Sequence, residues 1–142
     1  MNASGPNPYL KTKVLTASPE ELRLMLYEGA IKFCAQGREA LENNDFENSH
    51  AALMRAQKIV LELSTSLKHD IDPELCGKFG AIYNWIYRLL VDANVKHDPK
   101  LVDEAVELLH YERETWQLLI SRVAEEVGGN PPTPSGGLSL NG

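Results

Sequence analysis

Three short segments of the chain pair a helix-capping side chain with a proline: Ser18-Pro19, Asp72-Pro73 and Asp98-Pro99. A Ser or Asp side chain accepts hydrogen bonds from the free N–H groups at a helix start, and proline is favoured at the first helical position. Glu21, three residues after Ser18, completes a capping box. Helices are therefore predicted to begin at residues 19, 73 and 99.

A further helix is predicted between the first two of these starts, capped by Asn44-Asp45. The four helices then cover about 19–43, 46–67, 73–94 and 99–126. The connections are short, which makes successive helices antiparallel neighbours. No alternating β-branched run and no Asn-Gly turn indicates a strand. The predicted fold is all-α, an antiparallel up-down four-helix bundle over residues 18–127.

Both ends of the chain lack this helical pattern. Residues 1–17 are predicted to form an extended N-terminal arm, because they contain neither a helical stripe nor the apolar run of a signal peptide. Four apolar side chains mark this arm: Tyr9, Leu10, Val14 and Leu15. Residues 128–142 contain five glycines and three prolines. Such a composition predicts a flexible C-terminal tail.

The composition limits the kinds of partner and the compartment. The formal net charge is −6 and no cluster of Lys or Arg interrupts it, so nucleic acid and anionic membranes are not expected partners. No window approaches the roughly 18 apolar residues of a membrane span. Cys34 and Cys76 form no Cys-x-x-Cys pair and are predicted to be reduced thiols in the core. We therefore expect a cytoplasmic protein.

Two Glu-x-x-His segments, Glu47 to His50 and Glu107 to His110, raise the question of a di-iron site. Such a site in a four-helix bundle also needs an inward-facing Glu from each of the other two helices. The third predicted helix has no Glu after Glu74, and helical spacing places Glu107 and His110 opposite the core. No metal or other cofactor is expected. No Ser/His/Asp or Cys/His arrangement supports catalysis either, so an enzyme is not expected.

The predicted helices carry more apolar side chains than their own core requires. An apolar stripe of about 100° on each helix is enough to build a small bundle. The surplus side chains extend beyond this stripe, and we predict that they line an apolar groove for a partner: Ile59, Tyr83, Tyr87, Val91 and Ile120. A thicker core, with the Tyr hydroxyls reaching water, is the alternative.

Several segments together resemble the flagellin-specific export chaperones of the FliS family: TASPEELRLMLYEGAIKF, AQKIVLEL, IYNWIYRLLVDAN and Arg113-x-x-Trp116. The resemblance extends from about Tyr9 to Val123. It implies a cytosolic chaperone that binds the C-terminal segment of flagellin, prevents premature polymerisation and delivers flagellin to the flagellar type III export gate. The positions that match the family motifs are Tyr9, Ser18, Pro19, Leu26, Tyr27, Glu28, Gly29, Ala93, Asn94, Arg113 and Trp116.

The resemblance also suggests a role for the arm and singles out one departure. We expect the extended arm to cover the groove, with its four apolar side chains in place of a client. Glu112 stands where the family has an apolar residue. It is predicted to face the core beside Trp116, and either to extend to solvent or to pair with a cation. The alternative function is a self-associating structural bundle without a flagellin client. A monomer and a weak homodimer both remain open.

Overall fold

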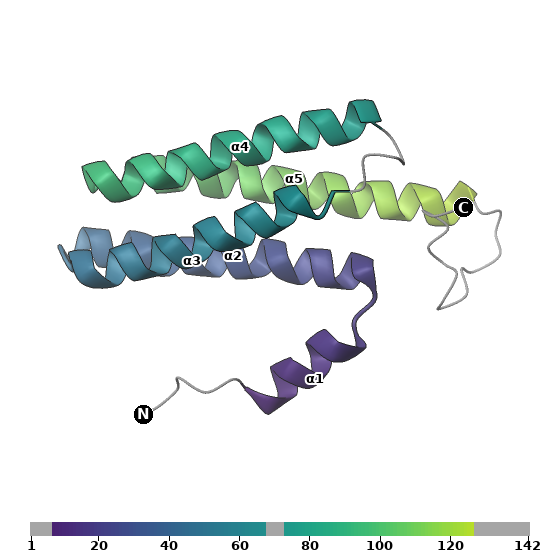
Figure 1. The fold of residues 1–142 in the computed structure, drawn as a ribbon, viewed down its shortest axis with the longest axis horizontal. Helices are drawn as coiled ribbons and strands as arrows, with labels where there is room; N and C mark the ends of the chain where they lie inside the picture. Colours follow the sequence, from purple (N-terminus) through teal and green to yellow (C-terminus); the bar gives the residue numbers. More distant parts are fainter. Residues whose placement is uncertain (1–6, 68–72, 127–142) are drawn as a thin grey trace.

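The computed structural model describes residues 7–67 and 73–126, which form helices joined by short turns (Figure 1). The helices are α1 Pro8–Thr16, α2 Pro19–Glu42, α3 Phe46–Thr65, α4 Pro73–Lys96 and α5 Pro99–Glu126. Helices α2 to α5 form an antiparallel bundle, in which each helix packs against the next and α5 closes against α2. The described residues contain no strand. The predicted all-α four-helix bundle is therefore confirmed.

The capping side chains act as the sequence predicted. The Ser18 backbone N–H donates to Glu21 Oε1 over 2.9 Å, and the Glu21 N–H donates to Ser18 Oγ over 3.2 Å. These bonds hold the pKa of Glu21 below its ordinary value. Asp45 caps α3 by accepting from the N–H of Asn48, after Asn44 turns the chain with a positive φ of 56°. The predicted helix limits differ from the observed ones only at the C-termini of α2, α3 and α4, by one or two residues.

The prediction of an extended N-terminal arm is wrong, because residues Pro8–Thr16 form helix α1. The Asn7 side chain accepts from the backbone N–H groups of Tyr9 and Leu10 over 2.9 and 3.4 Å, and Pro8 occupies the first helical position. Asn7-Pro8 is thus a fourth cap-proline pair. Helix α1 has no buried residue and lies outside the bundle, on the side away from α4 (Figure 1). The predicted tail, 128–142, lies outside the described residues.

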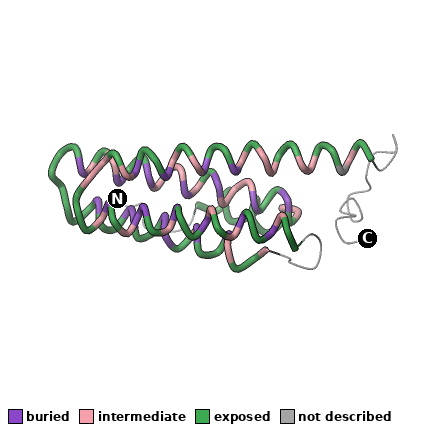
Figure 2. The backbone as a smooth tube through the Cα atoms, turned by 90° about the horizontal axis from the view of Figure 1, so that it is seen from above, coloured by how far each residue is buried: buried purple, intermediate pink, exposed green. Residues whose placement is uncertain are grey.

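Buried side chains from all four bundle helices form one core, while the outward faces are exposed (Figure 2). The core face of α2 is made by Tyr27, Ala30, Cys34 and Leu41, each at most 5% exposed. Cys34 and Cys76 are buried, reduced thiols, as predicted. Burial raises the pKa of the Cys34 thiol to about 12. None of the helices in the described residues is long and apolar enough to cross a membrane.

Gly37 marks a close approach of α2 to α3. A Cβ atom at Gly37 would lie 2.7 Å from Cδ2 of Leu53, which is fully buried. We expect Gly37→Val to lower the free energy of unfolding by about 2–3 kcal/mol, because overpacking must displace Leu53 or separate the helices. Gly77→Ala is the matched control. A Cβ there meets nothing within 4 Å, so a gain of about 0.5–1 kcal/mol is expected from helix propensity. Urea unfolding measures both, and an unchanged Gly37→Val midpoint would contradict the close contact.

Candidate partner-binding surface

Apolar side chains of α2 and α3 remain partly exposed along the line where these two helices meet. We call this the α2–α3 strip: Leu22, Leu26, Gly29, Phe33 and Ile59. The backbone of Gly29 lies against the Ile59 side chain, since a Cβ at Gly29 would be 3.3 Å from Ile59 Cδ1. The guanidinium carbon of Arg55 lies 5.5 Å from the centre of the Phe33 ring and borders the strip.

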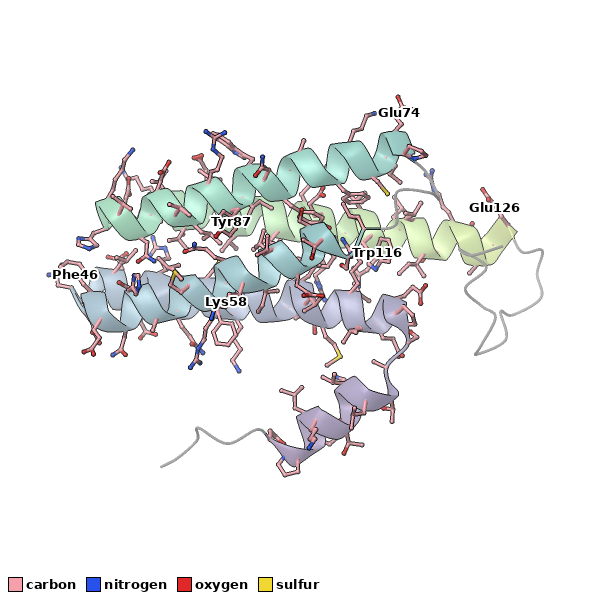
Figure 3. All side chains as sticks on the ribbon, viewed as in Figure 1. Phe46, Lys58, Glu74, Tyr87, Trp116 and Glu126 are labelled. Carbon is pink, nitrogen blue, oxygen red and sulfur yellow. The ribbon has the colours of Figure 1, made fainter. Side chains whose placement is uncertain are left out.

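A second apolar strip lies on the other flank of α3, toward α4. We call this the α3–α4 strip: Met54, Leu61, Tyr87 and Val91. Leu61 is two residues, or about 200°, from Ile59 and so lies on the opposite flank of α3. Gly80 marks the side of α4 that faces α3, because a Cβ atom at Gly80 would contact the side chain of Leu67, just after the end of α3. Tyr87 (labelled in Figure 3) is seven residues, or two helical turns, after Gly80 and so lies on the same side. Met54 is 37% and Leu61 52% exposed, while Tyr87 and Val91 are half-buried.

The structure distributes the predicted groove residues over several places. Ile59 belongs to the α2–α3 strip, and Tyr87 and Val91 belong to the α3–α4 strip. Ile120 is half-buried on α5, beyond the level at which α3 ends. The prediction for Tyr83 is wrong, because its side chain is 0% exposed. Sequence spacing could not show which of Tyr83 and Tyr87 is buried, since the two residues are one turn apart on the same face of α4.

The N-terminal residues do not cover either strip. Tyr9 and Leu15 are both 74% exposed, Leu10 is 49% and Val14 is 40% exposed. A segment that shielded apolar side chains would lose this exposure. The prediction that these four side chains cover the groove in place of a client is therefore wrong.

Tyr83 belongs to a polar group of side chains at the end of the bundle where α2 begins. We call this the bundle-end cluster: Arg23, Tyr27, Tyr83, Glu112 and Trp116. The Arg23 guanidinium donates to Ser66 Oγ and to the Leu63 carbonyl, each over 2.9 Å, and to the Tyr83 hydroxyl over 3.0 Å. The hydroxyls of Tyr27 and Tyr83 are hydrogen-bonded to each other. Arg23, itself 8% exposed, therefore ties α2 to both α3 and α4.

Helix α5 completes the bundle-end cluster with Trp116 (Figure 3) and Glu112. The guanidinium carbon of Arg23 lies 5.2 Å from the centre of a Trp116 ring, a cation–π distance. Glu112 is 1% exposed, and its Oε1 has no hydrogen-bond partner among the described residues. Burial raises the pKa of the Glu112 carboxyl to about 7, and the positive charge of Arg23 opposes this rise. The predicted inward orientation of Glu112 is correct, with Arg23 as the nearby cation.

The motif positions fall mainly at helix starts and in the core. Ser18 and Pro19 open α2, Tyr27 and Ala93 are fully buried, and Leu26, Gly29 and Asn94 are half-buried. Arg113 donates to Glu28 over 3.0 Å, a partly exposed ion pair that joins α5 to α2. Neither periodicity nor motif indicates that Arg23 is buried, although it connects α2 with α3 and α4.

The two Glu-x-x-His segments lie on the surface. Glu47, His50, Glu107 and His110 are all exposed, which agrees with the orientation predicted for the second pair. Within residues 7–67 and 73–126, no group of three or more His, Cys, Asp or Glu side chains is arranged to hold a metal ion.

Comparison with known proteins gives one consistent result. The model of a family described as "Flagellar protein FliS" matches residues 1–123. The chain is 37% identical over 127 residues to "Flagellar secretion chaperone FliS" of Bacillus subtilis, a match that covers 87% of this chain and 94% of that protein. A relative of the same name from Salmonella typhimurium is 30% identical over 123 residues, 81% of this chain and 89% of its own length.

A solved structure supports the fold independently. It is titled "Crystal structure of flagellar chaperone from bacteria", and it superposes with a TM-score of 0.68 at 19% sequence identity. The superposition covers 80% of this chain and 96% of that one. At this identity the likeness concerns the fold alone. The family match and the two sequence relatives, which span nearly the whole bundle, establish that the chain belongs to the FliS family of flagellar secretion chaperones.

Proposed function

We propose that this protein is a cytosolic export chaperone that binds the C-terminal segment of flagellin. It keeps that segment from polymerising early and delivers flagellin to the export gate of the flagellar type III apparatus. The proposal assigns the protein no catalytic activity and no cofactor. Its relatives are named as flagellar secretion chaperones, and flagellin is the client that the sequence resemblance implies.

The observation that carries the proposal is the partly exposed apolar surface on both flanks of α3. Partly exposed strips of this kind on a small bundle are suited to bind an amphipathic helix, whose apolar side chains recur every three to four residues. Two strips that share α3 can take two short helices of one client chain. A client that is disordered before binding would pay its ordering entropy on contact and wrap this large surface.

Tyr87 offers the most direct test of the α3–α4 strip. Its ring is half-buried and packs against the core, but it is not part of the bundle-end cluster. We expect Tyr87→Glu to weaken binding of a flagellin C-terminal segment at least about tenfold, because the complex would bury an unpaired charge. Isothermal titration calorimetry measures the affinity, and thermal unfolding monitored by circular dichroism verifies that the variant folds.

Trp85→Glu is the matched control on the same helix. Trp85 is 51% exposed and lies two residues before Tyr87, about 200° round the helix and so away from the α3–α4 strip. The affinity of this variant for flagellin should equal that of the wild type. Equal binding by Tyr87→Glu and the wild type would remove the α3–α4 strip from the interface. Light scattering tests the function itself: the chaperone forms a 1:1 complex with the segment. A dimer indifferent to the segment would instead indicate a self-associating structural bundle.

A further inference from the structure

The second half of α5 is held to the bundle by few contacts. Glu112, which is 1% exposed, is the last buried residue of this helix, and none of the side chains described after it is buried (Figure 2). We call residues 112–126 the α5 end segment. Within residues 7–67 and 73–126, the Arg113–Glu28 ion pair is the only hydrogen bond or ion pair that joins this segment to another helix. A helix end with so little burial and so few polar bonds opens more easily than the core.

Three polar side-chain atoms of the α5 end segment are buried without a hydrogen-bond partner among the described residues: Glu112 Oε1, Arg113 Nε and Trp116 Nε1. Each of these atoms has been removed from solvent without gaining a protein partner, which destabilises the closed arrangement. The guanidinium carbon of Arg23 lies 5.2 Å from the centre of a Trp116 ring and holds the segment against α2. Detachment would return all three atoms to solvent, so the polar groups of the segment oppose the closure that its apolar side chains favour.

The charged and titratable groups that face Glu112 come from two other helices. Arg23 and Tyr27 lie on α2, and Tyr83 lies on α4. Arg23 is the cation among them, and its guanidinium already donates to three acceptors on α3 and α4. Helix α3 contributes only neutral acceptors to this cluster. Ionised Glu112 is therefore buried beside one cation whose hydrogen bonds are directed elsewhere, and the closed arrangement favours the protonated carboxyl.

We propose that ionisation of Glu112 promotes opening of the α5 end segment as a unit, while α2, α3 and α4 stay folded. The helix parts from the bundle beyond Leu109, which is fully buried and belongs to the core. Opening hydrates the Glu112 carboxylate and separates Trp116 from Arg23. Because α5 packs against α2 and α4, both strips beside α3 stay in place. The opening is a property of the free protein and does not depend on a client.

The dependence of this opening on pH follows from the two environments of the carboxyl group. The pKa of Glu112 is about 7 in the closed fold, and it returns to the ordinary 4.5 when the opened segment hydrates the carboxyl. Between these values the closed segment binds a proton that the opened segment has released, so a rise in pH favours opening. The opened fraction should increase about tenfold for each pH unit, and about 300-fold in all between the acid and alkaline limits.

Hydrogen exchange of the full chain, resolved by mass spectrometry between pH 5 and pH 8, tests the proposal without a client. Rates are corrected for the intrinsic pH dependence of amide exchange. We expect the amides of the α5 end segment to be less protected than those of α3 at every pH, since α3 exchanges only when the whole bundle unfolds. The protection of the α5 end segment should also fall about 70-fold over this range, as Glu112 ionises.

Glu112→Gln should abolish this pH dependence and hold the α5 end segment at the protection that the wild type shows in acid. Glu104→Gln, at an exposed position of the same helix, should behave like the wild type. Equal protection of the segment and of α3 would overturn the proposal, because the bundle would then open only as a whole. So would low protection that does not change with pH, since such fraying leaves Glu112 buried. A pH dependence that persists in Glu112→Gln would assign the effect to another group.

Discussion

Replacing Arg23 with methionine is expected to lower the free energy of unfolding by about 3–5 kcal/mol at pH 7, because it removes the cation from a buried polar network. The Leu63 carbonyl and the Tyr83 hydroxyl would each lose a donor. Glu112 would lose the nearby positive charge that lowers its pKa, so its buried carboxyl would be mainly protonated at pH 7. Because methionine fills a similar volume, the loss of stability is caused by the broken hydrogen-bond network more than by a cavity. Urea unfolding at fixed pH measures it.

Arg38→Met is the matched control on the same helix. The Arg38 side chain is 39% exposed and forms ion pairs with Glu42 and Asp103, each at 2.6 Å. It therefore has more ion pairs than Arg23, but solvent screens them and a much smaller loss of stability is expected. If the two variants lost similar stability, burial would not explain the importance of Arg23.

A double-mutant cycle separates the Arg23–Glu112 interaction from the other contacts of Arg23. Without Arg23 the pKa of Glu112 rises further, so Glu112→Gln relieves a larger ionisation cost than it does in the wild type. Measured at about pH 9, where wild-type Glu112 is ionised, the double variant is expected to be more stable than the sum of the single effects predicts, by about 1–3 kcal/mol. Simple additivity would show that the guanidinium acts only through Leu63, Ser66 and the tyrosines.

The helices of the bundle could be predicted from the sequence because their starts are local signals. Ser18-Pro19 specifies its own hydrogen bonds within one turn, so no distant residue is needed. The same signal occurs at Asn7-Pro8, but the eight helical residues after it have no apolar stripe. They belong to an isolated helix of marginal length, so amphipathic spacing predicts no helix there. A cap-proline pair was therefore better evidence for a helix here than amphipathic spacing.

The partner surface and the bundle-end cluster were less predictable, because they depend on how the helices are rotated against one another. The most continuous apolar line on α2 contains Leu22, Leu26 and Phe33, which resembles a core stripe. In the structure this line is the partly exposed flank beside α3, and the core face contains Tyr27 and Cys34. Arg23 lies on that buried face and is paired across the bundle. A single sequence cannot show such pairing, since the partners are 40 to 60 residues away.

The stability of the protein is expected to fall as the pH rises from about 4.5 to about 7, through the ionisation of Glu112. The ordinary pKa of a Glu carboxyl is 4.5, and the pKa of Glu112 in the fold is about 7, because burial opposes its charged form. Between these values the folded protein retains a proton that the unfolded chain has lost. The stabilisation by this retained proton is therefore complete below pH 4.5, the pKa of Glu112 in the unfolded chain. It is lost as the pH rises through about 7, the pKa of Glu112 in the fold. The total is about 3 kcal/mol, at 1.36 kcal/mol for each pKa unit.

Glu112→Gln isolates this effect from the other titrating groups, because glutamine keeps the shape of the protonated acid and cannot ionise. The wild type and the variant should be about equally stable at pH 4.5. Above pH 7.5 the variant should be more stable, by the same amount of about 3 kcal/mol. Glu104→Gln, at an exposed position of the same helix, should leave the pH profile unchanged. A Glu112→Gln difference that is constant across this range would mean that Glu112 stays ionised in the fold. Arg23 would then compensate the carboxylate fully, and the bundle-end cluster would contain a complete buried ion pair.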